Sequence, residues 1–269
     1  MRSENEQWSS VSRAFGKQSF HFDQDDFANP VLHQWRQQVY AHVDRFIKPG
    51  SRILELNAGT GIDAVRFAKS GHTVHATDLS DGMIAKLNEK AASPSLVNRI
   101  TVQQVSFEHL EEVSGKFDYV FSNFGGLNCT NNLIKITNQL PQLLTPSAFV
   151  TWVIMPPVCP WELTWILKGK FKKAFRRLNK KGAMAHLEGE FFMTYYYSLS
   201  AIEKAFHDQF EFIKSEGLGI FSPPPAAVKF IYKHPRLAKF LNNADRRIQN
   251  HFPFSRWGDH ILVTFQLKS

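Results

Sequence analysis

The sequence predicts an α/β fold with a doubly wound parallel sheet. Short apolar segments alternate with longer segments in which apolar residues recur every three or four positions. Glycine, proline or short polar turns separate the two kinds of segment. The alternation is regular from residue 52 to residue 155. Strands that alternate with helices at this spacing indicate parallel strands covered by helices on both faces of the sheet.

The expected strands of this regular part are short and apolar: RILEL (52–56), HTVHATD (72–78), ITVQQV (100–105), FDYVFSNF (117–124) and AFVTWVIM (148–155). The expected helices have apolar residues at helical spacing and lie at 31–47, 61–71, 82–93 and 131–144. Pro49 and Gly50 end the first of these helices, and Gly71 closes the second. Ser80 or Asp81 is suited to cap the third.

The regular alternation stops after Met155. Residues 156–190 are expected to form an inserted helical segment, and residues 222–256 a second excursion. Regular elements return as strands at 191–198, 211–221 and 260–268 and as a helix at 198–210. Residues 1–30 are expected to be a polar arm followed by a short aromatic segment. Both excursions are expected to fold onto the main domain.

Composition narrows the class of protein. The 269 residues are 43% apolar, which suffices for a sizeable core, and the formal net charge is +8. No apolar run reaches the roughly 18–20 residues that span a bilayer, and the N-terminus lacks the apolar stretch of a secretory signal. Cys129 and Cys159, the two cysteines, suggest neither a disulfide framework nor a zinc site. A cytoplasmic protein without a metal is therefore expected.

The segment GTGIDA, from Gly59 to Ala64, fits the G-x-G-x-x-A pattern of dinucleotide-binding turns. Glu55 lies four residues before the first glycine, and a carboxylate aimed at this turn would repel a pyrophosphate. S-adenosylmethionine carries an ammonium and a sulfonium but no phosphate, so it suits an acidic residue here. The sequence therefore favours S-adenosylmethionine over a dinucleotide.

At these residues the chain resembles the class I S-adenosylmethionine-dependent methyltransferases. LELNAGTG, at residues 54–61, is similar to the first motif of that family, an acidic residue followed by G-x-G-x-G. The resemblance covers about residues 15–155, 198–221 and 258–267. It implies a Rossmann-like, seven-stranded mixed sheet whose last strand is antiparallel. It divides the chain into an N-terminal lid and helix (1–48), a cofactor-binding core (49–155), a cap insertion (156–197) and the rest of the core (198–269, with an insertion at about 222–256).

The resemblance also implies a set of cofactor-binding residues. Glu55 matches the acid near the methionine end of the cofactor, and Asp78 the acid that accepts both ribose hydroxyls. Asn57 stands where the family usually has glycine, and Ser106 where many relatives have aspartate for the adenine amine. The glycines are expected to let the backbone pass close to the cofactor. The remaining expected contacts are Phe20, Ala58, Gly59, Gly61, Leu79, Met83, Phe107, Ser122, Asn123 and Phe124, and Phe22 resembles part of the lid. The simpler interpretations stay open: Asp78 as a helix cap and Glu55 as a structural ion-pair acid.

Methyl transfer from a sulfonium needs alignment more than a catalytic triad. A general base is required only for a poor nucleophile such as an alcohol or phenol. The final antiparallel strand begins at the ligand side of such a sheet, so Asp259 and His260 are expected there, and His260 is the first candidate base. His21, in the lid segment, is the second. Glu162, Tyr195 and Tyr196 are cap residues that could orient an acceptor.

Residues 168–181, KGKFKKAFRRLNKK, contain eight Lys or Arg residues and no acid. Phe171 and Phe175 are four residues apart and would share a helix face. A basic amphipathic helix with aromatic residues suggests an anionic membrane surface, and a solvated basic face is the alternative.

The function expected from the sequence is S-adenosylmethionine-dependent O- or N-methylation of a small or medium-sized, rather apolar acceptor. An RNA or protein methyltransferase, a non-catalytic S-adenosylmethionine-binding protein and a dinucleotide-dependent oxidoreductase are the alternatives. The partner expected is a small or lipid-like molecule. An anionic membrane surface, to which the protein would bind peripherally, is a further candidate partner, and nucleic acid is ranked lower.

Overall fold

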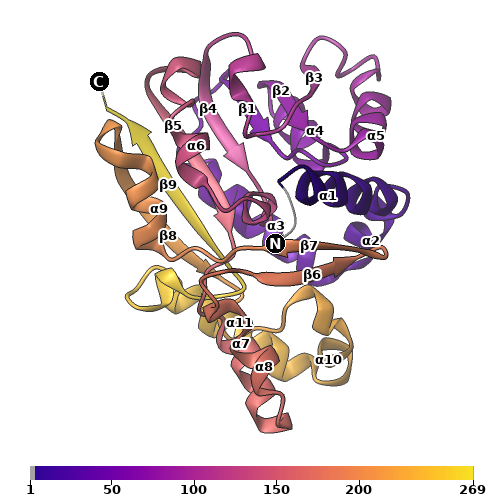
Figure 1. Ribbon diagram of the computed structural model, residues 1–269, viewed down its shortest axis with the longest axis vertical. Helices are drawn as coiled ribbons and strands as arrows, with labels where there is room; N and C mark the ends of the chain where they lie inside the picture. The colour runs from indigo at the N-terminus through magenta and orange to yellow at the C-terminus, as the bar shows by residue number, and fades with distance from the viewer. Residues whose placement is uncertain (1–3, 269) are drawn as a thin grey trace.

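The computed structural model describes residues 4–268, and its centre is a seven-stranded mixed sheet (Figure 1). The strand order is β3-β2-β1-β4-β5-β9-β8. The first five strands in sequence are parallel, whereas β9 runs antiparallel to both β5 and β8. The strands are β1 (Arg52–Leu56), β2 (Thr73–Asp78), β3 (Ile100–Gln104), β4 (Phe117–Ser122), β5 (Leu144–Ile154), β8 (Phe210–Leu218) and β9 (His260–Leu267). The Rossmann-like, seven-stranded sheet with an antiparallel last strand is therefore confirmed.

Helices cover both faces of this sheet because the central strands are apolar on both sides. Ile53 packs on one face with residues of α3 (Pro30–Val43), α4 (Ile62–Lys69) and α5 (Asp81–Ala91). The next residue, Leu54, packs on the other face with residues of α6 (Leu133–Thr137) and α9 (Leu199–Phe206). Successive residues of a strand point to opposite faces, so one short strand contributes to two cores.

The N-terminal residues differ from the expected polar arm. They form two helices, α1 (Glu4–Gln18) and α2 (Phe22–Ala28). Trp8, Val11 and Phe15 recur three and four positions apart and give α1 one apolar face. Polar residues surround this narrow stripe, which is why composition alone suggested an arm.

The cap insertion is only partly helical. It begins with α7 (Pro160–Leu163), two short 3₁₀ segments (Thr164–Lys168 and Arg176–Leu178) and α8 (Phe171–Ala174). It ends in a hairpin of β6 (Ala183–Leu187) and β7 (Glu190–Thr194). Glu188 and Gly189 form the two-residue turn with φ values of +49° and +78°, which suits the tight turn of a hairpin. The alternation in β6 was overlooked within a segment expected to be helical.

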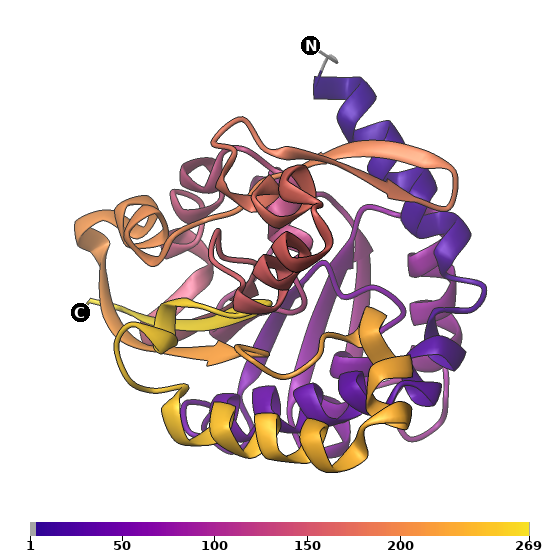
Figure 2. The ribbon, with the colours of Figure 1, turned by 90° about the horizontal axis from the view of Figure 1, so that it is seen from below.

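The second insertion contains α10 (Val228–Lys233) and α11 (Pro235–Ile248). Figures 1 and 2 show α7, α8, α10 and α11 together at the end of the molecule to which the parallel strands point. The helix expected at 131–144 is shorter than predicted, because Pro141 begins a separate 3₁₀ turn. None of the helices within residues 4–268 is long and apolar enough to cross a membrane.

Candidate functional site

A cavity of about 340 Å³ lies where β1, β2 and β4 end. This is the edge of a parallel sheet at which ligands bind in doubly wound folds. Its volume is at the lower end of the range for small-molecule sites. The walls include nine residues expected from the sequence: Asn57, Ala58, Gly59, Asp78, Leu79, Met83, Phe107, Asn123 and Phe124. They also include residues that the sequence did not indicate, among them Trp8, Val11, Phe15, Arg36, Asp63, Gly125, Gly126, Cys129, Met155, Ala185, Phe192 and Thr194.

Helix α1 and the β6–β7 hairpin close this cavity from outside. The side chain of Gln7 donates to the carbonyl groups of Cys129 and Met193 and accepts the Met193 N–H. Arg13 pairs with Glu190 in the hairpin at 3.0 Å. Trp8 meets the cavity residue Phe107 edge to face, with ring centroids 5.4 Å apart. The covering segment is therefore attached to both the hairpin and the core.

The turn after β1 has a backbone that few side chains tolerate. Asn57 and Gly59 have φ values of +47° and +58°, and asparagine is one of the few residues other than glycine that adopt this region readily. This explains how asparagine replaces the glycine usual in the family. Gly61 differs from expectation, because it does not line the cavity. A Cβ at Gly61 would lie 2.2 Å from Leu87 Cδ1, so Gly61 allows α4 and α5 to approach each other.

Asp78 ends β2 and faces the cavity. One carboxylate oxygen accepts the Gly59 N–H and the other the Ser80 N–H, both at 2.9 Å. Asp78 therefore ties the glycine turn to the start of α5 and still presents its carboxylate to the cavity. The helix-cap interpretation and the ligand interpretation are compatible.

Glu55 lies behind the turn and is only 1% exposed. Its Oε2 atom has no hydrogen-bond partner among the described residues, and none of their basic side chains forms an ion pair with it. Burial raises the pKa of Glu55 well above its usual value, and the nearby Asp63 and Asp78 raise it further against the lowering effect of Arg36. A buried carboxylate without a counter-ion is suited to a positively charged ligand.

Arg36 is the basic side chain of this cavity that the sequence did not reveal. It comes from α3 and pairs with Asp63 at 2.7 Å and with Asp26 at 2.9 Å. Its guanidinium lies 4.9 Å from the centre of the Phe124 ring. Asp63 also accepts from Tyr40 and from Asn123. The sequence did contain a signal for Arg36. This residue lies four residues before Tyr40, on a helix face that is otherwise apolar.

Ser122 supports the turn from a neighbouring strand and does not line the cavity. Its hydroxyl donates to Asn57 Oδ1 at 2.6 Å, and Asn57 Nδ2 donates to the Asn123 carbonyl at 3.1 Å. The Asn57 side chain occupies space beside Gly126, where a Cβ would lie 2.4 Å from Asn57 Cγ. The Asn57 side chain therefore fits only because residue 126 is a glycine.

Three other expected contacts lie outside the cavity walls. Phe20 is 83% exposed, because the chain turns between α1 and α2 there and the next aromatic residue, Phe22, lines the cavity instead. His21 lies at the surface, 3.3 Å from Glu188 and 3.5 Å from Asp25. Ser106 uses its hydroxyl to accept the Glu108 N–H. These positions do not match the roles expected for Phe20, His21 and Ser106.

His260 begins β9, is 7% exposed and lies just behind the cavity wall. Its ring is 5.7 Å from Phe124 and 6.0 Å from Trp35, both edge to face. Its Nε2 atom is 3.3 Å from the position that a Cβ on Gly125 would take. Because Gly125 lacks that atom, the imidazole can lie close to Gly125 and Met155, two residues of the cavity wall. Neither ring nitrogen has a well-oriented hydrogen-bond partner among the described residues.

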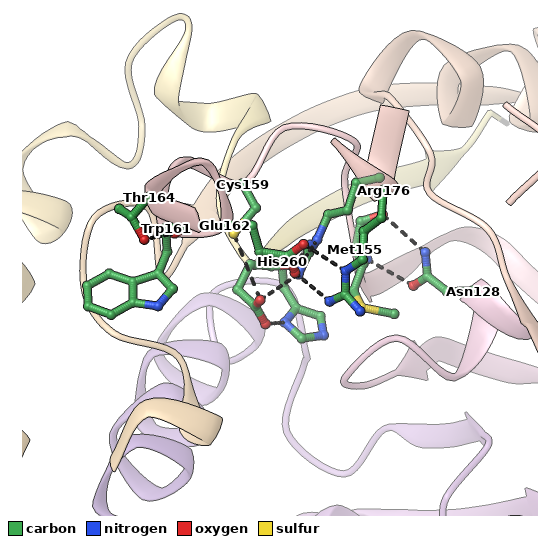
Figure 3. A network of polar contacts seen from close by, with 10 residues as sticks. Asn128, Met155, Cys159, Trp161, Glu162, Thr164, Arg176 and His260 are labelled. Atoms are coloured by element: carbon green, nitrogen blue, oxygen red, sulfur yellow. Dashed lines mark hydrogen bonds and ion pairs between the residues drawn. The ribbon is translucent and has the colours of Figure 1, made fainter. Parts of the chain in front are cut away.

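The neighbouring Asp259 belongs to a largely buried ionic network with the cap, and Figure 3 shows Glu162, Arg176 and His260 of this network. Asp259 lies 3.0 Å from His260 Nδ1 and 2.6 Å from Arg177. Arg177 also contacts Glu162 at 2.8 Å, and Glu162 pairs with Arg176 at 2.6 Å. Burial alone would raise the pKa of Asp259, but Arg177 and His260 outweigh it and lower the pKa.

The cap residues expected to orient an acceptor therefore have other surroundings. Glu162 is held by the two arginines, and Arg177 lies 5.2 Å from the centre of the Tyr196 ring. Glu162, Tyr195 and Tyr196 do not line the cavity.

The cavity residues, together with Glu55 behind the turn, fit S-adenosylmethionine. The uncompensated carboxylate of Glu55 suits a cation, and the carboxylate of Asp78 suits a pair of hydroxyl groups. Arg36 supplies a positive group for a carboxylate, and the backbone at Gly59 is free of a side chain. Leu79, Met83, Val105 and Phe107 add apolar walls for a planar ring.

Comparisons with known proteins agree with this geometry. A family model described as a methyltransferase domain matches residues 53–147. Demethylmenaquinone methyltransferase of Corynebacterium efficiens is 40% identical over 68 residues, which are 23% of this chain and 29% of that protein. The Thermobifida fusca protein of the same name is 32% identical over 127 residues, 45% of this chain and 51% of that one. The chain thus spans about a third to a half of the length of these relatives.

A solved structure extends the similarity of fold over the whole chain. Burkholderia thailandensis 1,6-didemethyltoxoflavin-N1-methyltransferase, with bound 1,6-didemethyltoxoflavin and S-adenosylhomocysteine, superimposes with a TM-score of 0.60. Its sequence identity is 13%, and the match covers 100% of this chain and 92% of that chain. The sequence similarity to a methyltransferase domain thus covers residues 53–147, and the similarity of fold to a solved methyltransferase extends over the whole chain.

Proposed function

We propose that the protein transfers a methyl group from S-adenosylmethionine to a small, largely apolar ring compound that carries an ionisable hydroxyl group. The observation that carries the proposal is a cavity, partly covered by α1 and the β6–β7 hairpin, that joins charged side chains to apolar walls. Glu55, Asp78 and Arg36 lie toward the ends of β1 and β2 and in α3, whereas Met155 and Phe192 line the cavity with side chains free of charge.

The covered cavity favours a small acceptor over a protein or an RNA. A macromolecular acceptor would have to displace α1 or the hairpin, which are joined by hydrogen bonds from Gln7 and by ion pairs. The relatives named above are demethylmenaquinone methyltransferases, and the solved structure of similar fold holds 1,6-didemethyltoxoflavin. A ring compound of this general kind has the apolar character of the cavity walls.

Within this proposal the residues of the chain bind the cofactor, orient the acceptor and accept a proton from it. Glu55 would hold the ammonium of the cofactor, Arg36 its carboxylate and Asp78 its ribose hydroxyls. S-adenosylmethionine supplies an electrophilic methyl group that is displaced in line from a sulfonium. His260 would accept the acceptor's hydroxyl proton at Nε2 as the oxygen attacks, so that an ether and an imidazolium form. The apolar walls would exclude water, which otherwise competes for the hydroxyl proton.

Calorimetry tests the cofactor assignment directly. S-adenosylhomocysteine is expected to bind with a dissociation constant in the low-micromolar range, roughly −7 to −8 kcal/mol, and NAD is expected not to bind. A heat of binding with NAD, together with no heat of binding with S-adenosylhomocysteine, would overturn the proposal.

The acceptor is tested with radiolabelled S-adenosylmethionine and a panel of hydroxylated naphthalenes, quinones and heterocycles. Label is expected in an organic extract, in a product heavier by one methylene group. Phe192→Trp narrows the apolar part and is expected to lower turnover while leaving S-adenosylhomocysteine affinity unchanged. If label enters bulk RNA or protein and no small compound, the macromolecular alternative holds.

A further inference from the structure

The positive charge of the chain is concentrated in its two insertions. Residues 160–181 and 228–252, called the docking lobe here, contain 14 of the 32 Lys and Arg residues but two of the 24 Asp and Glu residues. The docking lobe therefore carries a formal charge of +12, and the rest of the chain carries −4. The overall value of +8 is a property of this lobe alone.

Both acidic residues of the docking lobe are used inside the protein. Glu162 pairs with Arg176 and Arg177, and its side chain is 9% exposed. Asp245 is 2% exposed and accepts the N–H groups of three successive residues, 220 to 222. The surface of the lobe consequently presents positive charge without exposed carboxylates.

The two arginines that hold Glu162 are already paired inside the protein, although the Arg176 side chain is 42% exposed, and residues 168–181 do not form one continuous basic helix. Arg177 is 4% exposed at its side chain, and α8 is a single turn. The other twelve basic side chains of the docking lobe form no ion pair with a described residue: Lys168, Lys170, Lys172, Lys173, Lys180, Lys181, Lys229, Lys233, Arg236, Lys239, Arg246 and Arg247.

The same lobe exposes large apolar side chains. Nine are solvent-exposed, from 37% for Leu163 to 88% for Leu167: Leu163, Leu167, Phe171, Phe175, Leu178, Tyr232, Leu237, Phe240 and Phe252. Lys168, Lys170 and Lys173 surround Trp165 within 5.2 Å of its ring centre. Exposed apolar residues among lysines are typical of segments that lie in a membrane interface.

The two parts of the docking lobe act as one surface. Trp161 of α7 and Phe230 of α10 meet edge to face at 5.3 Å. Seen from below, α11 runs along the helices at the edge of the sheet (Figure 2), and both parts lie at the end of the sheet to which its parallel strands point (Figure 1). This is also the end of the sheet that holds the cavity.

We propose that the docking lobe binds the surface of an anionic lipid bilayer through both insertions. Lysine and arginine would meet the lipid phosphates, and the exposed leucine and phenylalanine side chains would enter the region just beneath them. The exposed leucines favour a bilayer over RNA, because bases stack on aromatic rings and gain little from branched aliphatic side chains. Binding needs neither cofactor nor acceptor, so its failure is distinguishable from failure of the proposed methyl transfer.

Co-sedimentation with phosphatidylcholine vesicles, with and without phosphatidylglycerol, tests the charge requirement. Two triple variants remove three charges each: Lys168→Gln, Lys170→Gln and Lys172→Gln in one insertion, and Lys233→Gln, Arg236→Gln and Lys239→Gln in the other. Each is expected to lower the partition coefficient on anionic vesicles at least about tenfold. Added salt is expected to lower it for the natural sequence.

The matched control removes three lysines from the opposite end of the sheet. Lys48, Lys69 and Lys116 are exposed and precede β1, β2 and β4, so Lys48→Gln, Lys69→Gln and Lys116→Gln change the net charge equally. This variant is expected to sediment like the natural sequence. Equal losses in all three variants, or equal binding to neutral vesicles, would overturn the proposal. So would tighter binding to bulk RNA that disappears in the lobe variants.

A fluorescent label tests insertion independently of charge. Both native cysteines are buried, so Leu167→Cys and Phe240→Cys can each be labelled selectively with a polarity-sensitive dye. Anionic vesicles are expected to shift the emission of both labels to the blue. Val97→Cys, 54% exposed before β3, is the control and is expected not to shift. Unchanged emission at both lobe positions would rule out insertion.

Discussion

Glu55 and Asp78 in the cofactor half, and Glu162 and Asp259 where the cap meets β9, are carboxylates that folding largely removes from water. The two regions differ in how the negative charge of these carboxylates is balanced. Glu55 has an oxygen without any partner among the described residues, and burial raises the pKa of both Glu55 and Asp78. Glu162 and Asp259 share Arg177, and their pKa values are lowered despite burial.

The difference agrees with the binding role proposed for the region of Glu55 and Asp78 and with a structural role for the region of Glu162 and Asp259. A buried charge without a counter-ion is unfavourable in the free protein, so at Glu55 the missing charge is expected from a ligand. At the cap the protein supplies the counter-ion itself, and a further cation would gain little there. His260 stands between the two regions, close to Asp259 and to the cavity.

The largest expected effect belongs to His260. If its imidazole accepts the acceptor's proton, His260→Ala should lower turnover of a hydroxyl acceptor by about 10²–10⁴-fold. Affinity for S-adenosylhomocysteine should stay nearly constant, because the imidazole would face the acceptor. His109→Ala, at an exposed histidine, is the control for both assays. Near-normal turnover in His260→Ala would remove the base and indicate an acceptor that is already nucleophilic.

Breaking the paired region should cost stability. Arg177→Met leaves Glu162 and Asp259 buried with fewer partners, and removing one member of a buried ion pair typically costs about 3–5 kcal/mol. Urea unfolding is expected to show a loss of this order. Arg13→Met, which breaks an exposed pair with Glu190, should cost at most about 1 kcal/mol. Equal losses of unfolding free energy in the two variants would mean that the buried network stabilises the protein no more than the exposed pair does.

Removing the unpaired carboxylate of Glu55 should change stability in the opposite direction. Glu55→Gln removes a carboxylate that is costly to ionise, so the free energy of unfolding at neutral pH should rise. Cofactor affinity should fall at least about tenfold, since a charge-assisted hydrogen bond contributes about 1.5–3 kcal/mol. Thermal melting and calorimetry measure the two effects. Lower stability and unchanged affinity together would identify Glu55 as a structural acid.

The raised pKa of Glu55 also fixes the sign of a pH dependence. The folded protein holds this proton at pH values where the unfolded chain has released it. The contribution of Glu55 to stability is therefore greatest below the ordinary glutamate pKa, and it is lost as pH rises through the raised value. Cofactor affinity should rise over the same interval, because ionised Glu55 is the form that attracts an ammonium. Glu55→Gln should show neither change.

The smallest expected effect concerns Asn57 and Gly126. Gly126→Ala forces a methyl group against the Asn57 side chain, and overpacking of this kind usually costs about 1–3 kcal/mol. Asn57→Gly should be tolerated by the left-handed backbone and should rescue Gly126→Ala. A double-mutant cycle by urea unfolding measures the coupling. Additive effects would show that the two positions do not interact.

The sequence by itself determined the sheet and predicted many of the residues that line the cavity. Strands such as 52–56 and 73–78 have strong local patterns, and Glu55, Gly59 and Asp78 lie at strand ends whose meeting point follows from parallel topology. The start of β9 on the ligand side followed in the same way. These features depend on local periodicity and on the direction of strands, both of which can be read along the chain.

Only the tertiary structure decided which charged side chains form ion pairs with one another and which segments cover the cavity. Arg36 meets Asp63 across 27 positions and Arg177 meets Asp259 across 82, and no local pattern encodes such pairings. The lid comes from α1 and a hairpin 171 to 186 residues away. The same separation explains why the sequence could not show that Phe20, His21 and Glu162 lie outside the cavity wall. A side chain's role depends on what packs against it, and distant segments supply that packing.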